Sequence, residues 1–130
     1  VTAAYSVEPD IGVAIDVTPA GDVPKCDPPL PVKVGKGPAV KVKDAYSIST
    51  PVVRDGLVAA AKRAGVAFQY EVLPYGGTDA GAMMSSRGGV PSGTLSIPCR
   101  YVHSPVETVS LKDMEDSVAL LKAYVEEIVE

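Results

Sequence analysis

The sequence predicts an α/β fold in which helices pack against a largely parallel or mixed sheet. Runs typical of strands occur at 11–18, 39–43, 68–73 and 94–97, and segments with helical spacing follow the last three of them. This alternation is typical of layered α/β domains. With 130 residues, of which 46% are hydrophobic, the chain can form a single domain with a sizeable core.

The first half contributes two strands and a long loop. The apolar run at 11–18 is too continuous for a half-exposed strand, which favours a strand buried on both faces. Residues 19–38 are rich in Pro and Gly, so a long ordered loop is expected there. Residues 39–43 alternate apolar and basic side chains, as a half-exposed strand does. The basic side chains of this region are expected to lie along a solvated strand edge: Lys33, Lys36, Lys41 and Lys43.

The second half adds three helices and two strands. Pro51 begins a helix that Gly65 ends as a C-cap. The strand at 68–73 leads into the turn Gly76-Gly77-Thr78-Asp79, where Thr78 or Asp79 can cap a short helix. After the strand at 94–97, Ser110 caps the last helix. One apolar stripe runs along that helix: Leu111, Met114, Val118, Leu121, Val125 and Ile128.

Composition narrows the class of partner and the compartment. A net charge of -4 argues against nucleic acid, whose binding needs clustered Lys and Arg. Cys26 and Cys99 are too few for a disulfide framework or a metal knuckle. The sequence shows no signal-peptide pattern and no long apolar stretch, so a soluble, cytoplasmic protein without a membrane partner is expected. Because Val1 is not Met and a strand pattern follows within a few residues, we expect a piece of a longer polypeptide, or one from which a leader or tag was removed.

Two residues are candidates for chemistry. His103 is the only histidine, and Glu107 follows it by four positions. A neutral imidazole is the commonest metal ligand and a frequent general base, although a packed or surface histidine is the alternative. Asp16 lies within or at the end of an apolar strand, where a carboxylate needs a cation or several donors. The alternative for Asp16 is that it accepts backbone N–H bonds in the next turn.

These candidates follow predicted strands. In open α/β sheets, ligands gather at the carboxyl ends of strands. Asp16 follows one strand, Gly76–Asp79 another and Arg100–His103 a third, so a convergent site is expected. One Asp and one His are fewer than the three protein ligands of a catalytic zinc site, so the residues alone indicate half a site. The Gly-rich turn lacks the Lys-Ser/Thr ending of a phosphate loop, and no Gly-x-Ser-x-Gly nucleophile elbow is present.

Five motifs in order resemble the C-terminal part of the tetrahedral (TET) aminopeptidases. They are Glu8-Pro9-Asp10 through Ala14-Ile15-Asp16-Val17-Thr18, Gly35-Lys36-Gly37-Pro38, Gly76-Gly77-Thr78-Asp79-Ala80, Gly89-Val90-Pro91-Ser92 and the segment from Arg100 to Glu107. These cytosolic metallopeptidases are also known as glutamyl or deblocking aminopeptidases and, historically, as cellulase M or endoglucanase. The resemblance implies a three-layer, zinc-peptidase-like (phosphorylase/hydrolase-like) sheet with flanking helices, incomplete because the N-terminal part is absent. Residues 1–130 would then form the C-terminal portion of the catalytic domain, without the dimerisation domain.

The resemblance also implies roles for single residues. Asp16 would bind one of two divalent ions, zinc or cobalt, and His103 the other. Gly77, Thr78 and Asp79 would lie on the substrate side of the pocket. The implied reaction is metal-assisted hydrolysis of the N-terminal peptide bond of a peptide, with the ions binding the amine, polarising the carbonyl and holding a hydroxide. From its spacing, Glu107 would support His103 or serve in packing.

The chain departs from the family pattern at its upstream side. The first His-x-Asp, the bridging Asp and the Glu-Glu pair with the general base are missing, so this chain contains no catalytic residue and is expected to be inactive alone. Its partner would be the upstream half of the same enzyme, and the complete enzyme would form large homo-oligomers.

Two alternatives remain. An endoglucanase-type glycoside hydrolase needs two carboxylates flanking a sugar subsite, which no pattern here marks. A non-catalytic module of the same fold would bind no metal between Asp16 and His103.

Overall fold

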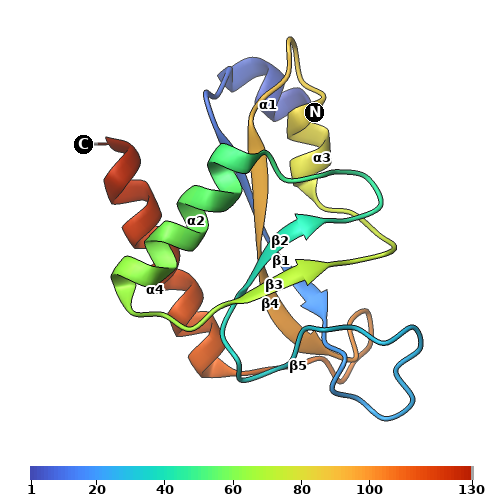
Figure 1. Cartoon of the computed structure of the whole chain (residues 1–130). Helices are drawn as coiled ribbons and strands as arrows, with labels where there is room; N and C mark the ends of the chain where they lie inside the picture. Colours follow the sequence, from blue (N-terminus) through green and yellow to red (C-terminus); the bar gives the residue numbers. More distant parts are fainter. Residues whose placement is uncertain (130) are drawn as a thin grey trace.

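The computed structural model describes residues 1–129 and has a mixed sheet with helices on both faces (Figure 1). The strand order is β1-β4-β2-β3, and β5 pairs with the C-terminal end of β4. β1 and β4 are parallel, as are β2 and β3, whereas β2 and β4 are antiparallel. The expected α/β fold is therefore confirmed. The elements are α1 (Thr2–Val7), β1 (Gly12–Pro19), β2 (Ala39–Lys43), α2 (Pro51–Ala64), β3 (Gln69–Val72), α3 (Asp79–Met84), β4 (Ser92–Arg100), β5 (Thr108–Val109) and α4 (Leu111–Val129).

The core lies between one face of the sheet and the helices α2 and α4. Val40 and Leu95, paired on β2 and β4, are fully buried there with Leu57 and Leu120. α3 contacts β1 and β4. It lies on the opposite face, because its N-cap Thr78 bonds to the hydroxyl of Thr94, the neighbour of Leu95. The helices thus form the two outer layers of a three-layer arrangement.

β1 is an edge strand in the part of the chain that the structure describes. Its one strand neighbour there is β4. Ile15 is 53% exposed and Asp16 is also exposed, so the expectation of a strand buried on both faces is wrong at these positions. The side chains of this apolar run are suited to burial, but within residues 1–129 no strand pairs with the outer edge of β1.

Most of the apolar stripe of α4 faces solvent, although Leu121 packs against the core. Val118, in the middle of the stripe, is 69% exposed. The helix instead buries a mixed face that includes Asp113 and Leu120. The carboxylate of Asp113 accepts hydrogen bonds from the amides of Gly35, at 2.7 Å, and Gly37, at 2.9 Å. Those bonds hold α4 in a rotation that leaves the rest of the stripe exposed within the described residues.

Three of the four lysines are solvated as expected, but they do not lie along a strand edge, because Lys33 and Lys36 are in the loop before β2 and Lys43 is on β2, an inner strand. Lys33, Lys36 and Lys43 are exposed. Lys41 is 2% exposed, so the expectation is wrong for this residue. The physical reason is that β2 lies between β4 and β3, where Lys41 pairs with Glu71.

Two short elements were not expected from the sequence. α1 occupies residues 2–7, where the sequence suggested an approach to a strand, and β5 is only two residues long. α1 is tied to the turn after α3: the Arg87 guanidinium lies 4.0 Å from the ring centroid of Tyr5 and 2.7 Å from the Glu8 carboxylate. These are tertiary contacts, which local periodicity does not reveal.

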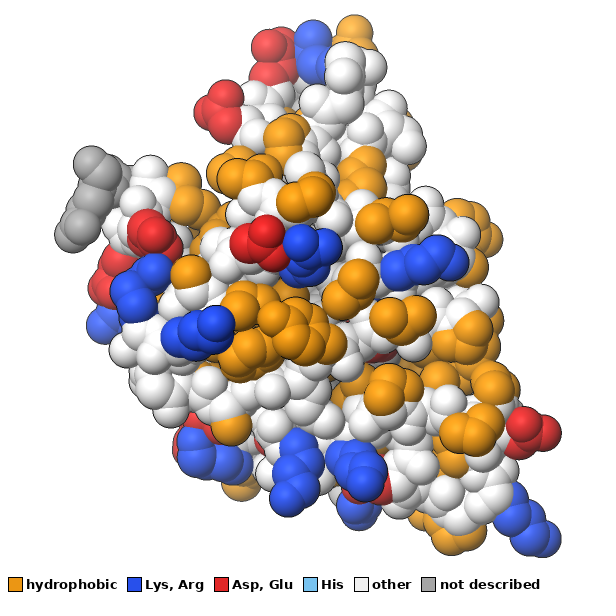
Figure 2. Space-filling view, viewed as in Figure 1, with side chains coloured by type: hydrophobic (Ala, Val, Ile, Leu, Met, Phe, Trp, Pro, Cys, Tyr) orange, Lys and Arg blue, Asp and Glu red, His pale blue; other side chains and the backbone are white. Residues whose placement is uncertain are grey.

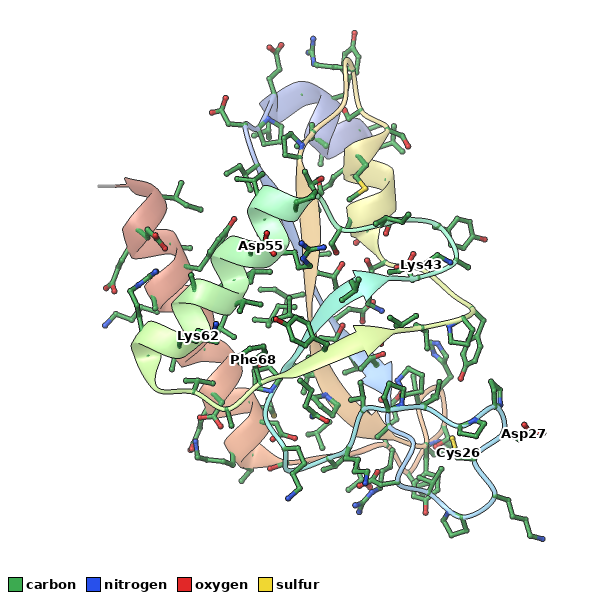
Figure 3. The ribbon with its side chains drawn as sticks, in the orientation of Figure 1. Cys26, Asp27, Lys43, Asp55, Lys62 and Phe68 are labelled. Atoms are coloured by element: carbon green, nitrogen blue, oxygen red, sulfur yellow. The ribbon has the colours of Figure 1, made fainter. Side chains whose placement is uncertain are left out.

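The segment between β1 and β2 is a long loop, as expected. Cys26 and Asp27 lie at its tip, away from the sheet (Figure 3). The Arg100 guanidinium ties the loop to the end of β4 through two hydrogen bonds to Asp22, of 3.1 and 2.7 Å.

The surface shows no concentration of one charge on the face in view. Lys and Arg side chains there are dispersed among apolar and acidic ones (Figure 2). Among the described helices, none has the length and apolar character needed to cross a membrane.

Candidate functional site

The sheet has a polar face, on which α3 lies. β1 and β4 pair in register, with Ala14 opposite Thr94 and Asp16 opposite Ser96. Since successive side chains alternate between faces, Asp16 lies on the same face as Thr94, whereas Ile15 lies on the face of α2 and α4. β1 thus presents a carboxylate to one side of the sheet and apolar side chains to the other.

A cavity of about 310 Å³ opens on this polar face. Its lining includes Asp16 from β1, Gly77 and Thr78 from the turn before α3, and His103 from the turn after β4. A neighbouring cavity of about 540 Å³ shares Asp16, Gly77 and Thr78 and adds Asp79. The structure therefore brings together the residues that the sequence singled out, with Asp16 between the two cavities.

The strand-end argument explains only part of this convergence. The expectation that Asp16 follows a strand is wrong, because Asp16 lies within the C-terminal half of β1. His103 follows the parallel strand β4, so both residues lie toward the same end of the sheet. β3 runs antiparallel to these strands, so the Gly-rich turn leaves the opposite end. It returns across the polar face, where the Ala45 amide donates to the carbonyl of Gly76 at 3.1 Å and the hydroxyls of Thr78 and Thr94 lie 2.8 Å apart.

Asp16 has an exposed carboxylate. Its Oδ1 atom accepts a hydrogen bond from the amide of Val17 at 2.8 Å. Within residues 1–129 it forms no ion pair. A carboxylate that faces a cavity without a cationic partner is free to bind a cation.

His103 is exposed, and its backbone is in the left-handed region with φ of 64°. The carboxylate of Glu107 accepts a hydrogen bond from the backbone amide of His103 at 2.6 Å. The Ser104 hydroxyl donates to the carbonyl of Tyr101 at 2.6 Å. Glu107 thus holds the backbone of His103 rather than its ring, and the turn is shaped by its own side chains.

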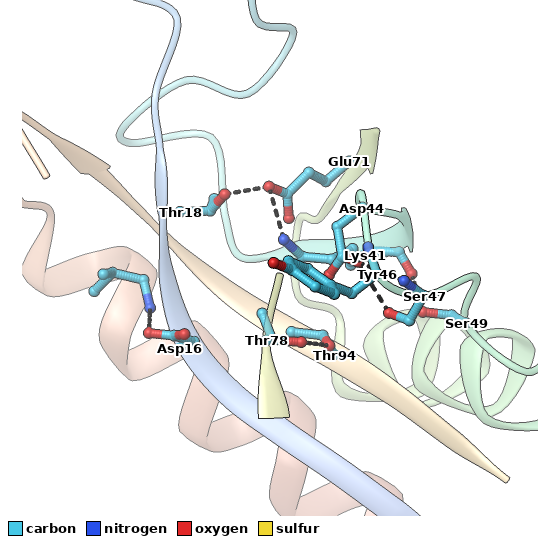
Figure 4. A network of polar contacts seen from close by, with 11 residues as sticks. Asp16, Thr18, Lys41, Asp44, Tyr46, Ser47, Ser49, Glu71, Thr78 and Thr94 are labelled. Carbon is cyan, nitrogen blue, oxygen red and sulfur yellow. Dashed lines mark hydrogen bonds and ion pairs between the residues drawn. The ribbon is translucent and has the colours of Figure 1, made fainter. Parts of the chain in front are cut away.

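Lys41 and Glu71 form a buried polar cluster that the sequence analysis missed. Lys41 lines the same cavity as Asp16 and His103, and its Nζ atom lies 3.3 Å from Oε1 of Glu71. The Thr18 hydroxyl donates to the same oxygen (Figure 4). Lys41 and Glu71 are in register on neighbouring strands. Their opposite charges were the one sign in the sequence that could have indicated this pair.

The described residues do not form a complete metal site. No group of three or more His, Cys, Asp and Glu within residues 1–129 could hold an ion. A catalytic zinc site normally has three protein ligands, whereas the shared cavity offers one carboxylate and one imidazole. A complete site would need further ligands from outside the described residues.

The motifs that contribute to this cavity match a known family. The sequence profile of the M42 glutamyl aminopeptidases covers residues 1–120. The chain belongs to the M42 family. M42 peptidases are metal-dependent aminopeptidases, which agrees with the presence of an Asp and a His in one cavity.

Individual M42 relatives support this assignment. A protein of Acetivibrio thermocellus is 52% identical over 120 residues, which span 92% of this chain and 36% of that protein. The lysyl aminopeptidase of Pyrococcus furiosus is 36% identical over 127 residues, which span 97% of this chain and 36% of that protein. This M42 chain thus spans about a third of the length of these relatives.

Solved M42 structures show the same fold. Aminopeptidase APDkam598 from the archaeon Desulfurococcus kamchatkensis has a TM-score of 0.91 at 41% identity, covering 97% of this chain and 36% of that chain. The structure of PhTET1-12s, a dodecamer of the TET1 peptidase of Pyrococcus horikoshii, has a TM-score of 0.82 at 31% identity, covering 95% of this chain and 36% of that chain. A Thermotoga maritima structure named as an endoglucanase has a TM-score of 0.72 at 25% identity, covering 99% and 39%.

Proposed function

We propose that residues 1–130 are the C-terminal portion of the catalytic domain of an M42 aminopeptidase that acts on peptides in the cytoplasm. The complete enzyme removes N-terminal residues with the help of two divalent ions, zinc or cobalt, and assembles into a homo-oligomer. Asp16 contributes a ligand to one ion and His103 a ligand to the other. The remaining ligands, the general base and the dimerisation domain belong to the part of the enzyme outside this chain.

The observation that carries the proposal is the shared cavity. Asp16 and His103 lie far apart in the sequence, yet they line the same cavity with Gly77 and Thr78. Both cavities are bordered by Gly77 and Thr78, and the larger one also by Asp79. These positions support a role of the three residues on the substrate side of the pocket. Glu107 supports His103 through its backbone amide.

The experiment is reconstitution of activity. The chain is mixed with the separately produced remainder of the Acetivibrio relative, zinc or cobalt is added, and hydrolysis of amino-acid p-nitroanilides is measured. The proposal expects activity from the mixture and none from either part. Asp16→Ala and His103→Ala should each abolish it, whereas Asp55→Ala, on the surface of α2, should leave it unchanged.

Two results would contradict the proposal. One is robust aminopeptidase activity from the isolated chain. The other is hydrolysis of carboxymethyl-cellulose, rather than of the anilides, by the mixture, which would favour the glycoside hydrolase reading.

A further inference from the structure

The cavity of about 310 Å³ has apolar walls and a charged floor. Its lining includes the apolar residues Leu73, Tyr75 and Val102 together with Lys41. Because Lys41 is only 2% exposed, it borders the cavity from the sheet beneath and forms part of the floor. Figure 4 shows the Nζ atom of Lys41 directed toward Glu71. The one lysine at this cavity is therefore already engaged by an anion of the same chain.

The charge of Lys41 is balanced before any substrate arrives. Its Nζ atom lies 3.3 Å from Oε1 of Glu71, and both side chains are 2% exposed. The Thr18 hydroxyl donates to the same oxygen, which holds the carboxylate in place. A buried lysine without an anion would attract a negatively charged ligand strongly, because charges interact strongly where water is excluded. Glu71 cancels that attraction, so the floor carries no net charge.

The two cavities differ in the part of a peptide that each can receive. An aminopeptidase has to hold the N-terminal side chain on one side of the ions and the rest of the peptide on the other. The cavity of about 310 Å³ contains both proposed ligands, Asp16 and His103, and is the smaller and more enclosed one, which suits a single side chain. The cavity of about 540 Å³ shares Asp16 and is more open, which suits the peptide beyond the cleaved bond.

We infer that the smaller cavity receives the side chain of the substrate's N-terminal residue, and that the pair of Lys41 and Glu71 selects an uncharged, apolar side chain such as that of leucine or methionine. The inference rests on the proposed function. An N-terminal glutamate would meet a lysine that is already paired, and an N-terminal lysine would meet the cation of Lys41. Either charged side chain would lose its hydration without gaining a free counter-ion. Glu71 is thus a positioning residue that acts through Lys41.

Substrate selectivity tests the inference directly. The chain is mixed with the remainder of the Acetivibrio relative and zinc, and kcat/KM is measured for the p-nitroanilides of leucine, glutamate and lysine. We expect the leucine substrate to exceed each of the others by about tenfold or more. Glu71→Gln leaves Lys41 without its anion, so it should raise the ratio of glutamate to leucine by about tenfold or more. Lys41→Gln leaves Glu71 without its cation and should raise the ratio of lysine to leucine to a similar extent.

Two exposed ion pairs of α4 provide matched controls. Glu127 pairs with Arg63, and the Nζ atom of Lys122 lies 3.8 Å from Oε1 of Glu126. Glu127→Gln and Lys122→Gln make the same chemical changes on the helix that packs against the other face of the sheet, so both ratios should stay unchanged. A ratio measured within one variant does not depend on how much of that variant is folded. A general loss of stability therefore cannot imitate the expected change.

A binding measurement separates the inference from the proposed function, because it needs neither metal ions nor hydrolysis. The full chain alone is titrated with acetate at constant pH, and the ring signals of His103 are followed by NMR. His103 is the only histidine and lines the cavity, so its signals report on this site. We expect acetate to bind Glu71→Gln about tenfold or more tightly than it binds the unsubstituted chain. Glu127→Gln should not tighten the binding.

The outcomes are distinguishable. Tighter acetate binding by Glu71→Gln, with a mixture that hydrolyses no anilide, would support the charge balance of the cavity but overturn the proposed function. Hydrolysis by the unsubstituted mixture that favours glutamate or lysine over leucine would overturn the inference and retain the proposed function, and this result requires no substituted chain to fold. Selectivity or acetate binding that Glu71→Gln leaves unchanged would also overturn the inference.

Discussion

The Nζ atom of Lys41 lies 3.3 Å from Oε1 of Glu71, and both side chains are 2% exposed. The Thr18 hydroxyl donates to the same carboxylate, so this cluster links β1, β2 and β3 next to the cavity of Asp16 and His103. We expect Lys41→Ala to lower the free energy of unfolding by about 3–5 kcal/mol, because it leaves Glu71 charged, buried and without its cation. Urea denaturation measures this loss.

The double variant Lys41→Met, Glu71→Leu is the control for that experiment. It removes both charges while keeping side-chain volume, so it should recover most of the stability lost in Lys41→Ala. Lys43→Ala, an exposed neighbour, should change stability by less than about 0.5 kcal/mol. If Lys41→Ala and Lys43→Ala cost the same, the buried pair does not stabilise the sheet.

Asp113 fixes the rotation of α4 by accepting hydrogen bonds from the amides of Gly35 and Gly37. Asp113→Ala should lower the free energy of unfolding by about 1–3 kcal/mol, because two amides lose their acceptor. Thermal unfolding measures this. Glu115→Ala, an exposed carboxylate of the same helix, should leave the melting temperature nearly unchanged. If both substitutions lowered the melting temperature equally, the loss would reflect the removal of a negative charge from α4 and not the loss of the hydrogen bonds to Asp113.

The pair of Asp22 and Arg100 gives a pH-dependent contribution. Hydrogen bonds from Arg100 hold the pKa of Asp22 below its usual value. Since the folded-state pKa is the lower one, the contribution is fully present above the unfolded pKa of about 3.9 and is lost as the pH falls through the folded value. Asp22→Asn should therefore cost about 0.5–1 kcal/mol at neutral pH and progressively less in acid. A cost that stays constant down to pH of about 2 would contradict the assignment.

The two cysteines should differ in reactivity. Burial raises the pKa of the Cys99 thiol, and its side chain is fully buried, whereas Cys26 is partly exposed in the long loop. Because the thiolate is the reactive form, the folded chain should react with a disulfide reagent in one fast and one slow step. Cys26→Ser should remove the fast step. If Cys26→Ser removed the slow step instead, the fast-reacting thiol would be Cys99, and Cys99 would therefore be accessible.

Much of the fold could be predicted from the sequence. The alternating strands and helices and the N-terminal Pro51 and C-terminal Gly65 of α2 are local signals, and the structure retains them. α1 could not be predicted, since it depends on contacts of Arg87 with Tyr5 and Glu8. The positions of Ile15 and Val118 were misleading because an apolar pattern shows that a residue suits burial, not that this chain supplies the cover.

The candidate site was predictable in its residues but not in its geometry. Asp16 and His103 were visible as a carboxylate in an apolar strand and a single histidine. The antiparallel pairing of β2 with β4, which sends the Gly-rich turn back across the sheet to Thr94, depends on long-range pairing that sequence spacing does not encode. The expectation that Lys41 lies on a solvated strand edge is wrong because β2 is an inner strand, and the order of the strands in the sheet cannot be taken from sequence spacing.

Metal binding tests the central claim that this chain carries only part of a site. Zinc titration calorimetry is performed on the chain alone and on its complex with the remainder of the Acetivibrio relative. We predict weak or undetectable binding by the chain alone, and two tightly bound ions in the complex, of which Asp16→Ala and His103→Ala each weaken one. Tight zinc binding by the isolated chain, or a complex whose zinc binding is unaffected by both substitutions, would contradict the account.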